Sequence, residues 1–130
     1  MKLLVTGTAG FIGHFVALEL LKVGHEVIGI DNVNDYYDVN LKEARLKNLH
    51  KFDNFIEERI DLVDKENLTR VFKTHKPKRV LNLAAQAGVR YSFENPYAYV
   101  DSNLIGFVNL EEQCRHNEIE HFVFASTASV

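Results

Sequence analysis

Short apolar runs alternate with segments of helical periodicity along this chain. The runs have the lengths of buried strands and cover residues 3–5, 26–30, 54–60, 79–83 and 121–125. Between them lie segments with the apolar spacing of amphipathic helices, over residues 11–23, 41–46, 65–75 and 96–116. Gly24 follows the first of these helices at the position of a C-terminal cap. The alternation predicts an α/β fold whose strands form one parallel sheet.

Five strands joined by helices favour a doubly wound, Rossmann-type sheet with the strand order 3-2-1-4-5. Crossover connections between parallel strands are right-handed, which limits the orders that the chain can adopt. No repeat, linker or low-complexity tract divides the sequence, so we expect one domain over residues 1–130. Ligands bind such sheets at the carboxyl ends of the strands. The residues that follow each strand are therefore the candidate functional residues.

Composition and charge narrow the possible classes of protein. The 130 residues are 46% hydrophobic and 25% charged, with a formal net charge of -3, as in an ordinary globular domain. Acidic and basic residues are interspersed, which disfavours nucleic-acid binding. There is one cysteine, Cys114, and no zinc-ligand spacing, which favours a reducing compartment. The first apolar run is too short for a signal peptide or a membrane span, so we expect a cytoplasmic protein that does not bind membranes.

Three glycines follow the first apolar run with the spacing G-x-x-G-x-x-G: Gly7, Gly10 and Gly13. One glycine permits the tight turn, the next lets a pyrophosphate approach the backbone, and the third lets helix and strand pack closely. The helix that begins with Phe11 and Ile12 directs free N–H groups and its positive dipole end at the anion. Glycine spacing alone also fits a purely structural turn. The position of this loop between a strand and a helix favours a dinucleotide site.

Asp31 ends the second predicted strand, 18 residues after Gly13. A carboxylate at this position accepts hydrogen bonds from the ribose hydroxyls of the adenosine. A 2′-phosphate about 4 Å away would be repelled by on the order of 4 kcal/mol at an effective dielectric of about 20. The glycine loop and the carboxylate together therefore favour NAD over NADP. The alternative role of Asp31 is to cap the turn that follows the strand.

These residues resemble the extended short-chain dehydrogenase/reductase family of NAD-dependent sugar epimerases and dehydratases. Residues 6–13 match its loop Thr-Gly-x-x-Gly-Phe-Ile-Gly, Asp61-Leu62 matches its adenine-side pair, and residues 82–85 match its cofactor-lining segment. Many relatives have His where this chain has Asn82, and Asn103 matches a helix asparagine near the active site. The resemblance implies these cofactor-binding residues: Gly7, Gly10, Phe11, Ile12, Gly13, Asp31, Asn32, Asn34, Asp61, Leu62, Leu83, Ala84, Ala85 and Asn103.

Two longer segments, residues 31–46 and 84–92, are similar to the UDP-glucuronate 4-epimerase branch of that family. The resemblance implies a UDP-sugar substrate and a redox epimerisation, in which bound NAD takes hydride from C4 of the sugar and returns it to the other face. It implies that Thr127 hydrogen-bonds the reacting oxygen, as a catalytic residue, and that Arg90 and Gln86 bind the substrate. From the residues alone, Thr127 also fits a polar turn and Arg90 a solvated surface arginine.

The family's catalytic Tyr-x-x-x-Lys pair has no counterpart here, because none of the tyrosines is followed four residues later by lysine. We therefore expect an N-terminal portion of the enzyme, truncated before the last strands and the C-terminal substrate domain, and inactive alone. The alternatives are a stand-alone NAD-binding regulatory module and another nucleotide-sugar epimerase or dehydratase. No Asp-Glu pair directly follows Thr127, which disfavours the dehydratase. The apolar stripe of residues 103–116 fits a homodimer interface or packing on the sheet.

Overall fold

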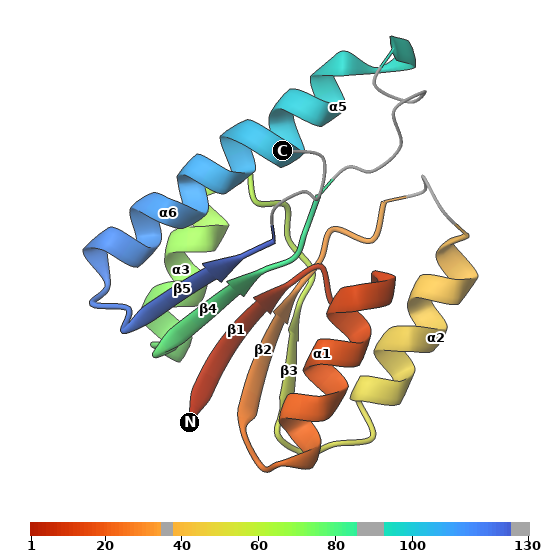
Figure 1. Ribbon diagram of the computed structural model, residues 1–130, viewed down its shortest axis with the longest axis vertical. Coiled ribbons are helices and arrows are strands. Elements are labelled where there is room, and N and C mark those ends of the chain that lie inside the picture. Colours follow the sequence, from red (N-terminus) through yellow and green to blue (C-terminus); the bar gives the residue numbers. More distant parts are fainter. Residues whose placement is uncertain (35–37, 86–92, 126–130) are drawn as a thin grey trace.

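A computed structural model of the chain describes residues 1–34, 38–85 and 93–125 and has the α/β order that the apolar pattern predicts (Figure 1). The strands are β1 (Lys2–Thr6), β2 (Glu26–Ile30), β3 (Phe55–Glu58), β4 (Arg79–Asn82) and β5 (His121–Phe124). The helices are α1 (Phe11–Lys22), α2 (Val39–Leu49), α3 (Lys65–His75), α5 (Pro96–Val100), the π-helical turn η1 (Asp101–Ile105) and α6 (Gly106–His116).

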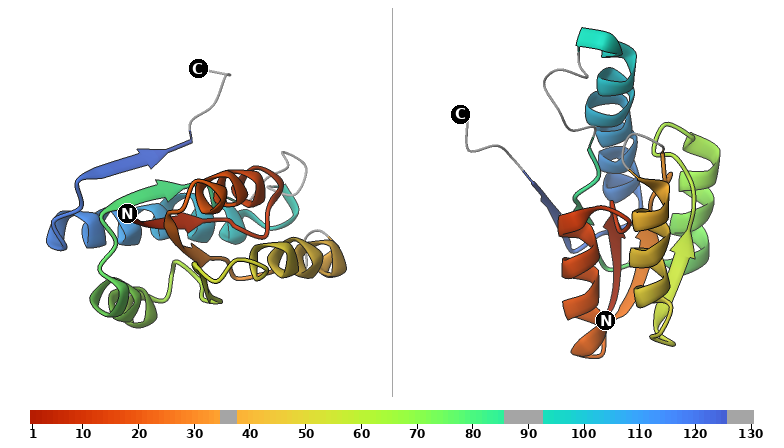
Figure 2. Two further views of the ribbon diagram at one scale, coloured as in Figure 1. Left: turned by 90° about the horizontal axis from the view of Figure 1, so that it is seen from below. Right: turned by 90° about the vertical axis from the view of Figure 1, so that its right-hand side faces the viewer.

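The five strands form one parallel sheet in the order β3-β2-β1-β4-β5, which confirms the predicted topology. Helices α1 and α2 cover one face of the sheet, and α3 and α6 cover the other (Figure 2). Because all strands are parallel, their carboxyl ends lie at one edge of the sheet. The loops after β1, β2, β3 and β4 therefore meet at that edge.

Each face of the sheet has its own hydrophobic core, since successive side chains of a strand point to opposite faces. In β1, Leu4 packs with α3 and α6, whereas Val5 packs with α1 and α2. Both side chains are fully buried. The α3/α6 core consists of Leu4, Ile28, Ile30, Leu62, Leu68, Val71, Phe72, Val80 and Leu110. The α1/α2 core consists of Val5, Ala9, Ala17, Leu21, Val27, Leu46, Leu49 and Phe55.

Three elements differ from the prediction by more than one residue at an end, or in continuity. Helix α2 is longer at both ends, and it begins after Asp38, whose side chain accepts a hydrogen bond from the Asn40 N–H at 2.9 Å. Strand β3 is shorter, because after Glu58 the chain turns and the Ile60 N–H bonds to the Glu58 carbonyl at 3.1 Å. The predicted single helix over 96–116 is a helical run interrupted by η1.

The turn η1 lets the helical run approach the segment after β3. At its end, the Gly106 N–H bonds to the Asp101 carbonyl, which is the wider spacing of a π-helix. A Cβ on Gly106 would lie 3.0 Å from the Leu62 Cβ, so glycine makes this close packing possible. One turn later, the buried Asn109 side chain donates to the Leu62 carbonyl at 2.9 Å. Leu62 is thus held by α6 through both packing and a hydrogen bond.

Strand β5 lies at an edge of the sheet and exposes apolar side chains. Val123 is 44% exposed and Phe124 is 52% exposed. Phe124 also packs against Phe107 of α6, with 5.1 Å between ring centroids. Among the residues that the structure describes, no helix has both the length and the apolar character needed to span a membrane.

We expect the hydrogen bond from Asn109 to the Leu62 carbonyl to contribute measurably to the free energy of unfolding. Asn109→Ala leaves the buried Leu62 carbonyl without this donor, which costs about 1–3 kcal/mol of unfolding free energy. Urea denaturation of the 130-residue chain measures the change. Asn48→Ala, at an exposed position of α2, is the matched control and should change stability by less than about 0.5 kcal/mol. Equal stability of the two variants would contradict the prediction.

Glu58 predicts a pH dependence of stability. Hydrogen bonds from Arg70, and then from His75, lower the pKa of Glu58 from its ordinary value of 4.5, although burial acts in the opposite direction. A lowered pKa in the folded state stabilises the fold above pH 4.5, and this contribution is lost as the pH falls below that value. Glu58→Gln should therefore be less stable than the parent at neutral pH, with the difference narrowing in acid. A pH-independent difference in urea denaturation would disprove this.

Candidate functional site

The chain passes from β1 into α1 through a tight loop packed against both neighbouring strands. Gly7 has a positive φ of 78°, which favours glycine, and its N–H donates to the Ile30 carbonyl of β2 at 2.7 Å. On the other side, a Cβ on Gly7 would lie 2.9 Å from the Ala84 backbone nitrogen after β4. The first glycine is thus required by the backbones on either side of it.

The other two glycines bring the start of α1 close to the loop. A Cβ on Gly13 would overlap the Gly7 carbonyl group and lie 2.6 Å from its carbon atom. Gly10 precedes the helix in an extended conformation and has no side chain to cap it. The first N–H groups of a helix have no acceptor within the helix, so this end of α1 offers free donors and a positive dipole end. That arrangement suits a bound phosphate group.

Asp31 is joined to the glycine loop by a direct hydrogen bond. Its Oδ2 accepts the Ala9 N–H at 3.0 Å, and its Oδ1 accepts the Val33 N–H at 2.7 Å. The turn-capping role that the sequence left open is therefore present, and the same carboxylate also supports the loop. On the other side of Ala9, the Arg45 Nη1 of α2 donates to the Ala9 carbonyl at 3.1 Å.

Thr6 ties the end of β1 to the end of β4. Its buried hydroxyl donates to Asn82 Oδ1 at 2.6 Å and accepts the N–H groups of Leu83 and Ala84, each at 3.0 Å. Asn82 is thereby engaged within the fold rather than at its surface. The segment after β4 is held in place beside the glycine loop.

The residues after β2 and β3 also meet at this edge. Asn32 donates through Nδ2 to Asp61 Oδ2 at 3.2 Å, and Asp61 Oδ1 accepts the Val63 N–H at 3.1 Å. Asn34 accepts hydrogen bonds from the Lys42 ammonium group at its carbonyl, 2.8 Å away, and at its Oδ1, 2.7 Å away. Both contacts keep polar side chains at the carboxyl end of the sheet.

Most of the residues predicted from the sequence therefore converge on one edge. The glycine loop bonds to Asp31 and lies against the backbone of Ala84, and Asn32 bonds to Asp61. Leu62 is buried beneath this edge, and Asn103 is exposed in η1, the turn before Gly106. Thr127, Arg90 and Gln86 lie outside the described residues.

Four contributors to the site were not predicted: Thr6, Arg45, Asn109 and Gly29. A Cβ on Gly29 would lie 2.8 Å from the Thr8 hydroxyl and 2.7 Å from the Phe55 ring. A glycine inside a strand is a recognised signal of such close approach, and it was available in the sequence. The partners of Thr6, Arg45 and Asn109 are distant along the chain, so these pairings cannot be predicted from local patterns in a single sequence.

Two buried polar side chains near the loop lack a hydrogen-bond partner among the described residues. They are Thr8, through its hydroxyl, and His14, through both ring nitrogens. Burial, and secondarily the charge of Arg45, lowers the pKa of His14 from its ordinary value of 6.5. His14 is therefore a neutral ring at neutral pH. It adds no charge to the helix end.

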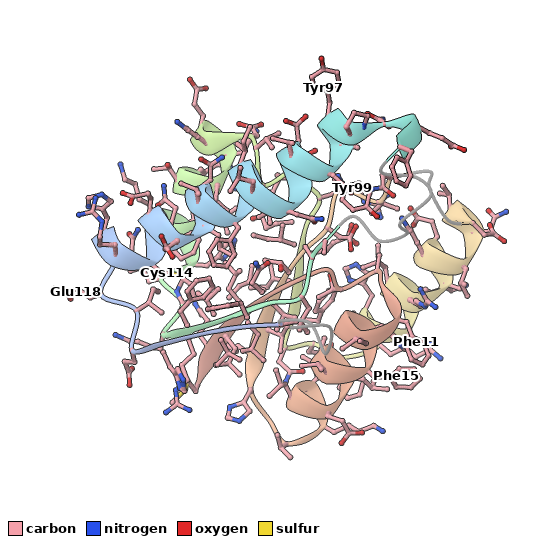
Figure 3. All side chains as sticks on the ribbon, turned by 45° about the horizontal axis from the view of Figure 1, so that its top comes forward. Phe11, Phe15, Tyr97, Tyr99, Cys114 and Glu118 are labelled. Atoms are coloured by element: carbon pink, nitrogen blue, oxygen red, sulfur yellow. The ribbon has the colours of Figure 1, made fainter. Side chains whose placement is uncertain are left out.

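Neither a metal-binding cluster nor a reactive cysteine is found among the described residues. They include no group of three His, Cys, Asp or Glu side chains that could hold a metal ion. Cys114, labelled on α6 in Figure 3, packs against the α3/α6 core, and burial raises the pKa of its thiol to about 11. A thiol with that pKa is protonated at neutral pH and is a poor nucleophile.

Known proteins are similar in sequence to this chain over its whole length. The family model described as GDP-mannose 4,6 dehydratase matches residues 4–130. Protein CapI of Staphylococcus aureus is 53% identical over 130 residues, which cover 100% of this chain and 39% of CapI. UDP-glucuronate 4-epimerase of Thermodesulfobacterium geofontis is 49% identical over 127 residues, which cover 98% of this chain and 39% of that protein.

A solved structure has the same fold: a mutant UDP-glucuronic acid 4-epimerase from Bacillus cereus, in complex with UDP-4-deoxy-4-fluoro-glucuronic acid and NAD. The TM-score is 0.91 at 34% identity, and the match covers 100% of this chain and 41% of that chain. The chain thus spans about two fifths of the length of these relatives. It belongs to the GDP-mannose 4,6-dehydratase family, whose members include NAD-dependent nucleotide-sugar epimerases and dehydratases.

Proposed function

We propose that residues 1–130 form the NAD-binding Rossmann domain of a nucleotide-sugar epimerase that acts on UDP-glucuronate. The observation that carries this proposal is the hydrogen bond between Asp31 and the Ala9 N–H. It joins the carboxylate expected at the adenosine ribose to the loop expected at the pyrophosphate. Two halves of one dinucleotide site are thereby fixed relative to each other.

The glycine loop fits a pyrophosphate. The close contacts of Gly7 and Gly13 leave no room for side chains, so the loop and the start of α1 stay close together. Phe11 and Ile12, the first residues of α1, are exposed to a ligand. In the proposed complex the diphosphate lies beside Gly10, at the N–H groups of Phe11 and Ile12. These groups and the helix dipole supply the counter-charge.

Asp31 and the residues after β3 fit the adenosine half. Each Asp31 oxygen accepts one backbone N–H and retains a further lone pair, which is available to a ribose hydroxyl. In the proposed complex Asn32, Asn34 and Asp61-Leu62 contact the adenine side. The Thr6 hydroxyl holds the segment after β4, so that Leu83, Ala84 and Ala85, with Asn103, line the nicotinamide half.

When bound, NAD supplies hydride acceptance and return, which is the chemistry that inversion at C4 requires. The part of this chain is to bind and orient the cofactor. Thr127 is proposed to hydrogen-bond the reacting oxygen, and Arg90 and Gln86 to bind the UDP-sugar. The names of the Thermodesulfobacterium and Bacillus proteins support UDP-glucuronate over other UDP-sugars. The single cysteine supports the cytoplasm as the location.

The outer side of the helical run from α5 to α6 supports a homodimer. Tyr97, Val100, Leu104 and Val108 are exposed at intervals of three or four residues, and together they form an apolar stripe. Tyr97 is 80% exposed and points away from the body of the protein (Figure 3). Such a stripe is typical of a surface that packs against another helix. We propose that a second copy of the chain provides that helix.

The proposed function predicts binding without turnover. The 130-residue chain should bind NAD in calorimetry, but should not convert UDP-glucuronate to its C4 epimer, because it contains no Tyr-x-x-x-Lys pair. Gly13→Ala should weaken NAD binding more than tenfold, since its Cβ overlaps the Gly7 carbonyl. Glu19→Ala, at an exposed position near the opposite end of α1, is the control, because alanine suits a helix and the position is far from the glycine loop. Turnover by this chain, or no binding of NAD, would refute the proposal.

Asp31 predicts the choice between NAD and NADP. Asp31→Asn preserves the size of the side chain but removes the charge that repels a 2′-phosphate. It also removes one of the two backbone hydrogen bonds, which affects both nucleotides, so the ratio of their affinities is the measure. The ratio of the NADP to the NAD dissociation constant should fall at least tenfold. A tenfold change corresponds to about 1.4 kcal/mol, and the expected repulsion is larger, on the order of 4 kcal/mol. Asp53→Asn removes an equal charge at an exposed site between α2 and β3 and should leave the ratio unchanged. An unchanged ratio in Asp31→Asn would place the ribose elsewhere.

A further inference from the structure

Arg45 reaches from α2 to the glycine loop, although it is 36 positions from Ala9 in the sequence. Its Nη1 donates to the Ala9 carbonyl at 3.1 Å. Its guanidinium carbon also lies 6.0 Å from the centre of the Phe11 ring, which is within the range of a cation–π contact. One half-buried side chain therefore contacts both the loop and the first residue of α1.

The Phe11 ring is held from a second direction. It makes an edge-to-face contact with Phe15, one turn further along α1, with 5.3 Å between ring centroids. Figure 3 shows the two rings together on one side of α1. Both are more than half exposed, so little else restrains Phe11. The Arg45 contact and the Phe15 contact together orient the ring at the start of the helix.

The peptide group between Ala9 and Gly10 is fixed at both ends. Its carbonyl oxygen accepts from Arg45, and its N–H, which belongs to Gly10, donates to the Gly7 carbonyl at 3.0 Å. The preceding peptide is fixed through the Ala9 N–H by Asp31. Of these restraints, only those from Asp31 and Arg45 come from side chains. Without Arg45, the peptide that leads into α1 would have no side-chain restraint on its oxygen.

We propose that Arg45 is a positioning residue for cofactor binding, which orients the glycine loop and the start of α1 toward a dinucleotide diphosphate through the Ala9 carbonyl and the Phe11 ring. The inference rests on the proposed function. It adds a residue of α2 to a site otherwise formed by the loops at the sheet edge. The planar guanidinium is needed because it donates to a carbonyl while its face lies near an aromatic ring.

The test compares NAD binding by the 130-residue chain and three variants in calorimetry. Arg45→Met keeps an unbranched side chain but removes the donor and the charge, and should weaken binding at least tenfold. Arg45→Lys keeps the charge but not the planar donor group, and should also bind more weakly than the parent. Lys47→Met removes one charge from an exposed position of the same helix and should bind within twofold of the parent.

The ionisation of His14 gives an independent readout. Both burial and the charge of Arg45 lower its pKa, so Arg45→Met should raise the His14 pKa, measured by NMR titration of the ring, whereas Arg45→Lys should keep it low. General loosening of the fold would affect the two variants without regard to charge. A raised pKa in Arg45→Met together with weak binding in both variants is the result expected from the proposal.

The outcomes separate this inference from the function on which it rests. A parent chain that binds no NAD would overturn the proposed function, and the role of Arg45 with it. A parent that binds NAD, with Arg45→Met equally tight, would overturn the role of Arg45 alone. If the amide NMR spectrum shows that Arg45→Met does not fold, Arg45→Lys decides: binding equal to that of the parent would overturn the proposal, and weaker binding would support it.

Discussion

The chain turns from β1 into α1 within four residues, in contact with the ends of both neighbouring strands. Gly7 bonds to the end of β2 and faces the backbone after β4, while Gly13 lies against the Gly7 carbonyl group. A Cβ at Gly7 would clash with the backbone after β4, and a Cβ at Gly13 would push α1 away from the loop. The packing of α1 on its face, and the access to the helix end, both depend on this one turn.

Hydrogen bonds from distant residues make the turn rigid. Thr6 joins β1 to the segment after β4, Asp31 holds the Ala9 N–H, and Arg45 holds the Ala9 carbonyl. Each of these hydrogen bonds has a modest net energy. Their effect is geometric, because they come from three directions and leave the loop little freedom. A site that is already ordered loses less entropy when a ligand binds.

The segment after β3 is supported from the other face of the sheet. Helix α6 reaches Leu62 because Gly106 has no side chain and because η1 shifts the helical run toward it. Asn109 then bonds to the Leu62 carbonyl. The segment Asp61-Leu62 therefore depends on α6, which ends the helical run whose outer side carries the apolar stripe. In the proposed dimer, this helical run would serve both the proposed cofactor site and the subunit interface.

The sequence by itself determined the order of elements, the parallel sheet and the edge that carries the site. These follow from local patterns: apolar runs for strands, helical spacing for helices, and a glycine loop followed by Asp31. Element ends were less certain, since Asp38 extends α2 and the turn after Glu58 shortens β3. Only the tertiary structure showed how Thr6, Arg45 and Asn109 support the site. The physical reason is that each acts on a residue at least 36 positions away, and such pairings arise from packing rather than from any periodicity in the chain.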